Sequence, residues 1–139
     1  MKYRLMDILA CPYDKKFPLT LIVINEQVVE RPYEWEKKPH CEEYCGLKGI
    51  FIKEVKEGME FPCEECIKRE IVEGILYCPE CGRWYPIKEE IPILLPDEYR
   101  TLKEDLEFLE KVKDILLQRE PELGKRILED GKPFNLRKR

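Results

Sequence analysis

The chain contains no serine, and His40 is its single histidine. A Ser-His-Asp triad requires both residue types, and a cysteine nucleophile ordinarily needs a histidine beside it. The composition therefore excludes the common hydrolase mechanisms, except one centred on His40. Amide side chains are also scarce while Glu and Lys are abundant, which is a bias of hyperthermophile proteins and predicts a thermophilic source.

Long apolar runs and excess positive charge are lacking as well. No run approaches the ~18–20 apolar residues that span a bilayer, and the opening "MKYRLMDILACP" has no signal-peptide core. A cytoplasmic protein without a membrane partner is therefore expected. The formal net charge is −4, so no basic field exists to attract nucleic acid. RNA contact is expected only indirectly or through the basic tail, residues 132–139.

The hydrophobic pattern predicts short β-strands followed by helices, in an α+β protein. Residues 4–9 favour a short helical turn, residues 17–30 a hairpin, and residues 73–87 two strands around a Cys-x-x-Cys turn. Residues 31–72 are polar and broken by prolines, which indicates an insertion held by its cysteines.

The period changes after Pro96 to that of an amphipathic helix. A helix over 101–119, with Thr101 and Glu104 as a capping box, is followed by a second helix over 121–130. Its predicted apolar stripe consists of Leu102, Leu106, Leu109, Val112 and Leu116.

Seven cysteines form one single position and three close pairs: Cys11, Cys41/Cys45, Cys63/Cys66 and Cys78/Cys81. In a reducing compartment they point to metal ligation ahead of disulfides. Tetrahedral zinc takes four ligands, so seven thiols suggest one complete site and one that borrows a ligand. Thiol catalysis is disfavoured, because Cys78 sits between apparent strands rather than at a helix N-terminus.

Two partitions of the cysteine pairs compete. Joining Cys41/Cys45 to Cys63/Cys66 leaves 17 residues between the pairs, whereas joining Cys63/Cys66 to Cys78/Cys81 leaves 11. The first is favoured and predicts a tight zinc site of Cys41, Cys45, Cys63 and Cys66. A second, weaker site would use Cys11, Cys78 and Cys81, with Asp14 as an oxygen ligand or His40 in its place. Disulfides and an empty Cys11 site stay open as alternatives.

A strongly apolar segment follows the last cysteine pair and includes Trp84, Tyr85, Ile91, Pro92, Ile93, Leu94 and Leu95. Pro92 restricts residues 91–95 to a sheet edge, and an exposed apolar edge is a template for pairing with another protein. Strand alternation predicts that Leu94 faces outward while Ile93 and Leu95 face the chain's own core. The alternative is that the whole segment is core.

The segments "LMDILACPYDKKFPLTL" and "EGILYCPECGRWYPIKEEIPILLPDE" together resemble a known family. It is the small zinc-binding activator subunit shared by methyltransferases that act on tRNA, ribosomal RNA and translation release factor, and archaeal members look closest. The resemblance implies a zinc-ribbon-like antiparallel β domain from residues 1–30 and 73–98. It also implies an inserted Cys-rich subdomain (31–72). The helices predicted from periodicity would then form a C-terminal region at 99–131.

The resemblance places the family's metal site on Cys11, Cys78 and Cys81, and Asp14 stands near a second early cysteine that this sequence lacks. It implies a non-catalytic subunit that forms a heterodimer with a class I methyltransferase, partly by adding a strand to its sheet. S-adenosylmethionine would bind only in that partner. A stand-alone zinc ribbon that binds nucleic acid or protein is the alternative, although "CEEYC", "CEEC" and "CPEC" put acid where phosphate would lie.

Overall fold

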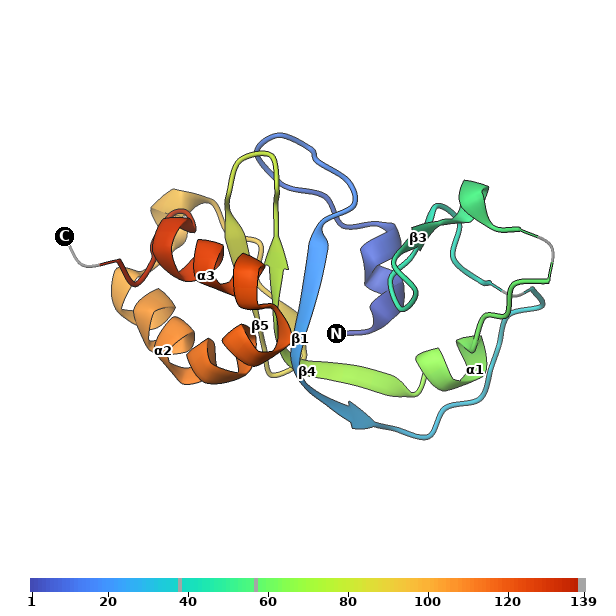
Figure 1. Ribbon diagram of the computed structural model, residues 1–139. Coiled ribbons are helices and arrows are strands. Elements are labelled where there is room, and N and C mark those ends of the chain that lie inside the picture. The colour runs from blue at the N-terminus through green and yellow to red at the C-terminus, as the bar shows by residue number, and fades with distance from the viewer. Residues whose placement is uncertain (38, 57, 138–139) are drawn as a thin grey trace.

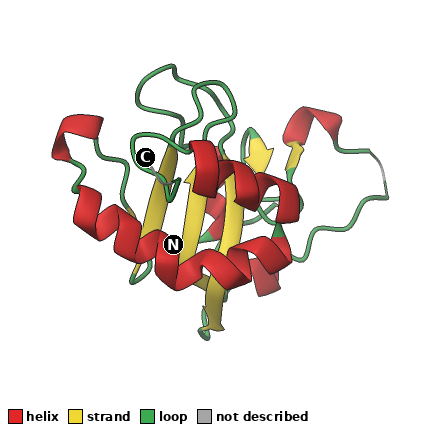
Figure 2. Ribbon diagram, turned by 60° about the vertical axis from the view of Figure 1, so that its left-hand side comes forward, coloured by secondary structure: helices red, strands yellow, loops and turns green. Residues whose placement is uncertain are grey.

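A computed structural model describes residues 1–37, 39–56 and 58–137 as a twisted antiparallel sheet with helices on one face (Figure 1). The opposite face carries the N-terminal 3-10 helix and the Cys-rich insertion, and Figure 2 shows the two long helices crossing in front of the strands. The fold class is α+β, as predicted. The sheet order is β1-β4-β5-β6, with bounds Thr20–Val28, Arg69–Tyr77, Trp84–Lys88 and Ile91–Pro92.

Strand β1 corrects the predicted hairpin. The apolar run and the following "NEQ" form one continuous strand that pairs with β4 from Thr20↔Tyr77 to Val28↔Arg69. The register shifts near Asn25, so the polar residues make an irregularity in the strand rather than a turn. Pairing along the whole of β4 has overridden the local turn preference.

Alternating side chains of the central strands supply two cores. Leu76 and Tyr85 face the layer of the 3-10 helix η1 (Tyr3–Asp7), whereas Ile75 and Trp84 face the helical layer. Successive strand residues point to opposite faces, so a four-strand sheet with both faces covered needs such residues at consecutive positions. The sheet therefore lies between the two cores and contributes side chains to both.

Helix α2 (Leu102–Arg119) and helix α3 (Pro121–Asp130) cover the second face. The predicted stripe is rotated, because Leu102 is exposed and Phe108 is buried against Trp84. The predicted capping box is wrong, since the Thr101 side chain caps no backbone group. The first turn is held instead by Arg100, whose guanidinium donates to the buried Asp105 at 2.9 Å. No helix in the described ranges is long and apolar enough to cross a membrane.

The insertion leaves the sheet after Val28 and returns at Arg69, whereas residues 31–72 were predicted for it. Among its described residues it contains only short elements: β2 (Tyr44–Cys45), β3 (Ile50–Phe51), η2 (Ile52–Glu54) and α1 (Cys63–Cys66). Asp7 of η1 anchors it by accepting the backbone N–H groups of Glu42, Glu43 and Tyr44 at 2.8, 2.6 and 2.8 Å. These bonds hold the pKa of Asp7 below its usual value despite its partial burial.

The C-terminal segment folds back on the helical core. Trp84 Nε1 donates to the carbonyl oxygen of Phe134 at 2.8 Å, and the Leu136 N–H donates to Leu128 at 2.7 Å. Arg137 pairs with Asp130 at 3.0 Å. The predicted tail is therefore packed as far as residue 137, and its residues 138–139 lie outside the described ranges.

Candidate functional site

Four side chains converge where the early loop meets the β4–β5 turn. The ligand atoms of Cys11, Asp14, Cys78 and Cys81 all lie within 4.8 Å of one another. In the described part of the chain no other group of three or more Cys, His, Asp or Glu converges in this way. The sequence ranked this site second, whereas the structure makes it the more compact of the two.

The site is built from two turns of the same design. The N–H of Lys15 donates to Cys11 O at 2.9 Å, and the N–H of Gly82 donates to Cys78 O at 2.9 Å. Lys15 and Gly82 both have positive φ, +63° and +80°. Asp14 therefore occupies, in the first turn, the position that Cys81 occupies in the second. The sequence signal for this equivalence is the shared Cys-Pro start and the matching x-x spacing.

The distances suit a tetrahedral ion. Zn–S bonds of about 2.3 Å in a tetrahedron place two sulfurs ~3.8 Å apart, and the Cys11 and Cys81 sulfurs are 3.8 Å apart. Cys78 Sγ lies 3.4 Å from Asp14 Oδ2. Three thiols and one carboxylate are ligands that zinc accepts, so these residues fit the ion that the resemblance implies.

Local hydrogen bonds distinguish the thiols. Burial raises the pKa of Cys11, but the Tyr85 hydroxyl at 3.4 Å and nearby backbone N–H groups outweigh it and leave the pKa lowered. Burial raises the pKa of Cys78 to about 12. The backbone N–H of Lys16 lowers the pKa of Asp14. The site thus offers one favoured thiolate and one carboxylate as initial anchors for a cation.

The four cysteines of the insertion are arranged differently. Cys41, Cys45, Cys63 and Cys66 are buried and line one small pocket, which also includes His40. Burial raises the pKa values of Cys41 and Cys66 to about 12. Their sulfurs are gathered less tightly than the ligands of the first site, and His40 lies here rather than beside Cys11.

Two residues predicted at a partner interface lie inside the chain. Trp84 and Tyr85 are each 0% exposed. Trp84 stacks on Phe108 with ring centroids 5.9 Å apart, and Tyr85 reaches Cys11 in the opposite core. Their prediction as surface anchors is corrected, because β5 is a central strand with both faces covered.

In the rest of the predicted interface, the residue expected to face outward is packed inward, and two residues expected to face the core are exposed. Strand β6 is only two residues long, and the chain leaves regular pairing after the Ile93 N–H donates to Pro86 O at 2.9 Å. Leu94 packs on the core beneath, whereas Ile91 is 61% and Leu95 40% exposed. Strand alternation beyond Pro92 therefore gave the wrong residue as the outward one.

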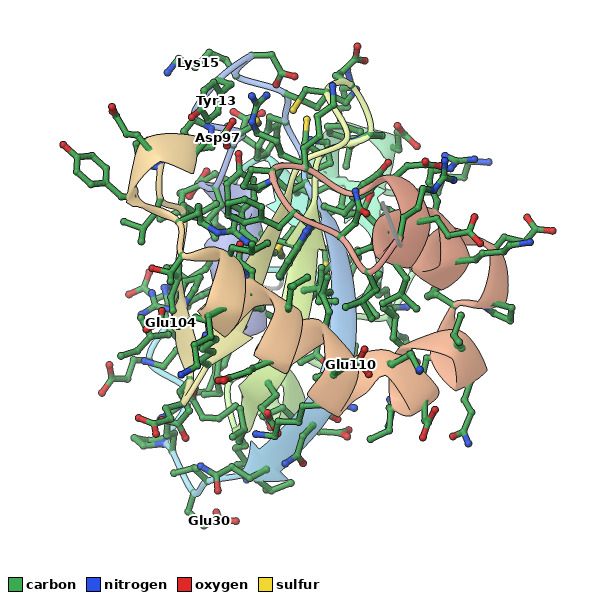
Figure 3. All side chains as sticks on the ribbon, turned by 90° about the vertical axis from the view of Figure 1, so that its left-hand side faces the viewer. Tyr13, Lys15, Glu30, Asp97, Glu104 and Glu110 are labelled. Atoms are coloured by element: carbon green, nitrogen blue, oxygen red, sulfur yellow. The ribbon has the colours of Figure 1, made fainter. Side chains whose placement is uncertain are left out.

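This apolar segment ends against the metal turns. The Asp97 carboxylate accepts a hydrogen bond from the Arg83 guanidinium at 2.8 Å. The backbone N–H of Asp97 donates to the Tyr13 hydroxyl at 2.6 Å. The guanidinium also lies 3.7 Å from the Tyr13 ring centroid. Figure 3 shows Tyr13, Lys15 and Asp97 together at one end of the molecule, with Glu30 at the other. The sequence singled out none of Tyr13, Arg83 and Asp97, because their pairing depends on the fold.

The outer edge of β6 opens onto a groove beside α2. The groove has a volume of ≈ 730 Å³ and is lined by Ile91, Ile93 and Phe108 together with charged residues of both signs. Between β6 and the first turn of α2, Tyr99 and Leu102 are also exposed, at 68% and 51%. β6 is the last strand of the sheet order, so no described strand covers this edge.

Comparison with known protein families identifies a relationship over most of the sheet and the insertion. A family model described as Trm112p-like protein matches residues 2–90, which include both metal turns, the insertion and strand β5. No curated protein sequence matches the chain.

Proposed function

Because the chain belongs to the Trm112p-like family, we propose that it is a non-catalytic activating subunit that forms a heterodimer with a class I methyltransferase. The methyltransferase would act on tRNA, ribosomal RNA or a release factor, and would itself bind S-adenosylmethionine. The observation that carries the proposal is the open sheet edge at β6 (Ile91–Pro92), together with the exposed apolar side chains of Ile91 and Leu95. An incoming strand gains backbone bonds at such an edge, and exposed side chains set its specificity.

Ile91 and Leu95 are the apolar anchors of this proposed interface, since both are exposed. Burying one such side chain contributes roughly 1.5–3 kcal/mol, so two or three contribute much of a stable complex before ordering costs are subtracted. Charged side chains along the groove, among them Glu104 and Lys111, form a polar rim on its α2 side.

The metal centre would stabilise this interface indirectly, because its two turns hold the end of the apolar segment. Cys81 and Arg83 lie in one turn and Cys11 and Tyr13 in the other, and Arg83 and Tyr13 both hold Asp97. When bound, zinc supplies a crosslink between the two turns. The turns in turn fix the end of residues 91–97, so the anchors are presented in one conformation and lose less freedom on docking.

Activation then follows from mass action. A subunit that binds only the competent fold of its partner shifts the partner's equilibrium toward that fold. The apparent affinity of the methyltransferase for S-adenosylmethionine should rise, while the isolated chain neither binds the cofactor nor transfers a methyl group.

The test is co-expression of the chain with methyltransferases of its source, using the Ile91→Asp/Leu95→Asp double variant. A buried unpaired carboxylate is costly, so the variant should lose the partner in pull-downs while keeping its metal and its melting temperature. Val28→Asp is the matched control, because Val28 is 73% exposed at the other end of the sheet. Retention of the partner by the double variant, or its equal loss by the control, would overturn the proposed interface.

A further inference from the structure

The insertion carries a second set of thiols that the first metal centre does not use. Cys41, Cys45, Cys63 and Cys66 are 7%, 7%, 5% and 7% exposed, and all four are free. They come from two segments that meet only in the fold, and they line the same pocket. Four buried thiols around one pocket form a complete ligand set for a tetrahedral ion.

The pocket has the size for one ion and for nothing larger. Its volume is ≈ 10 Å³, about that of one water-sized sphere. An organic ligand does not fit, and a lone water would meet chiefly weak sulfur partners. The space among the thiols therefore selects a single small occupant that sulfur binds well.

The insertion has only a small apolar core of its own and little regular secondary structure to stabilise it. Its buried apolar cluster consists of Cys45, Phe61 and Cys63, with partly buried side chains around it. Among the described residues between Val28 and Arg69, regular structure is limited to elements of two to four residues. Segments with so small a core are usually stabilised by a crosslink, and a metal site is one such crosslink.

His40 provides a second, independent indication that a charged or polar group binds in this pocket. Its side chain lies in the pocket lining and is 7% exposed, and neither ring nitrogen has a hydrogen-bond partner. The ring stacks on Trp35 with centroids 4.3 Å apart, which fixes it beside Cys41. A buried imidazole without partners is costly unless a charged or polar group is added nearby.

We infer that Cys41, Cys45, Cys63 and Cys66 form a second metal site that takes one zinc ion and orders the insertion. The thiols must move inward to share the ion, since they converge less tightly than the first group. Each ligating thiol releases its proton to solvent, and the bound thiolates supply the negative charge that His40 N–H can face.

Zinc stoichiometry of the full chain tests this inference, which is independent of the proposed methyltransferase role. The reduced parent should hold two zinc ions by elemental analysis after gel filtration. Cys63→Ser/Cys66→Ser and Cys78→Ser/Cys81→Ser should each hold one. A Cys63→Ser/Cys66→Ser variant that keeps the parent's zinc content would overturn the second site. His40→Gln is the matched control and should keep both ions; its loss of one would overturn the all-thiolate ligand set.

Alkylation of the parent keeps the inference testable if a variant does not fold. With zinc bound, iodoacetamide should leave Cys41, Cys45, Cys63 and Cys66 unmodified, as mapped by mass spectrometry. A chelator should expose them and speed backbone hydrogen exchange across residues 39–66. Equal modification with and without zinc, or recovery of these cysteines as disulfides from the reduced preparation, would contradict the site.

Discussion

The two cysteine groups of this protein contain the same type of residue, but the secondary structure that holds each group in place differs. Cys78-x-x-Cys81 bridges two paired strands, and Cys11 begins a turn of the same design, so the sheet and the two turns bring their ligand atoms together. Cys63-x-x-Cys66 forms one isolated helical turn, and Cys41 and Cys45 lie on loop and on a two-residue strand. Ligand spacing is similar in both groups. The scaffold decides which group is preorganised.

The largest difference between the sheet and the insertion should appear in the free energy of unfolding when the tryptophan of each region is replaced by alanine. Trp84→Ala should lower the free energy of unfolding by about 3–5 kcal/mol, because it opens a cavity beside Phe108 in the sheet's core. Trp35→Ala, in the half-buried insertion, should cost about 1 kcal/mol. Urea denaturation measures both. Similar losses for the two variants would show that the insertion is as well supported as the sheet.

Next comes the anchor between the regions. Asp7→Ala should cost about 2 kcal/mol of local stability, since hydrogen bonds to a charged acceptor are worth ~1.5–3 kcal/mol. The amides of Glu42, Glu43 and Tyr44 should exchange faster, while those of β4 stay unchanged. Hydrogen exchange followed by mass spectrometry measures this, with Asp114→Ala on the exposed face of α2 as control. Uniform acceleration through the sheet would contradict a local anchor.

Asp14→Cys should sharpen the contrast further. It gives the first site a fourth thiolate at the position equivalent to Cys81, and the zinc affinity should rise at least about tenfold. Asp14→Ala should lower it. Competition with a chromophoric chelator measures both constants, and each variant is compared in the Cys63→Ser/Cys66→Ser background. An unchanged affinity in the Asp14→Cys variant would remove Asp14 from the ligand set.

The smallest effect concerns pH. The Arg83 guanidinium lowers the pKa of Asp97, so the folded state binds this proton less readily than the unfolded state, where the pKa is about 3.9. The stabilisation is therefore complete above about pH 5 and is lost as the pH falls through the folded pKa. Because Asp97 is partly exposed, it amounts to less than about 1 kcal/mol.

Asp97→Asn isolates this contribution. The parent should exceed the variant in urea midpoint at about pH 7, and the gap should narrow as the pH falls below the unfolded pKa of about 3.9. A difference that stays constant across this range would mean that the Arg83 contact acts by packing rather than by charge.

Local pattern predicted the strands on either side of the Cys78-x-x-Cys81 turn and the two long helices, because periodicity is a property of short segments. The metal ligands were proposed from Cys spacing and stay a prediction. Local pattern failed where distant segments decide the outcome. β1 stays extended through Asn25 because β4 pairs along it, and Leu94 turns inward because β6 ends after two residues. The relative compactness of the two metal sites also depends on the fold, since it reflects which turns the sheet brings together.

The pair Val28↔Arg69 closes the excursion of residues 29–68 at its base. The entropy of closing a loop grows only with the logarithm of its length, so doubling the excursion would cost the sheet about 0.6 kcal/mol. Lengthening this segment would therefore leave the sheet and its first cysteine group nearly as stable as before. The stability of the sheet thus sets only a weak limit on the length of the insertion.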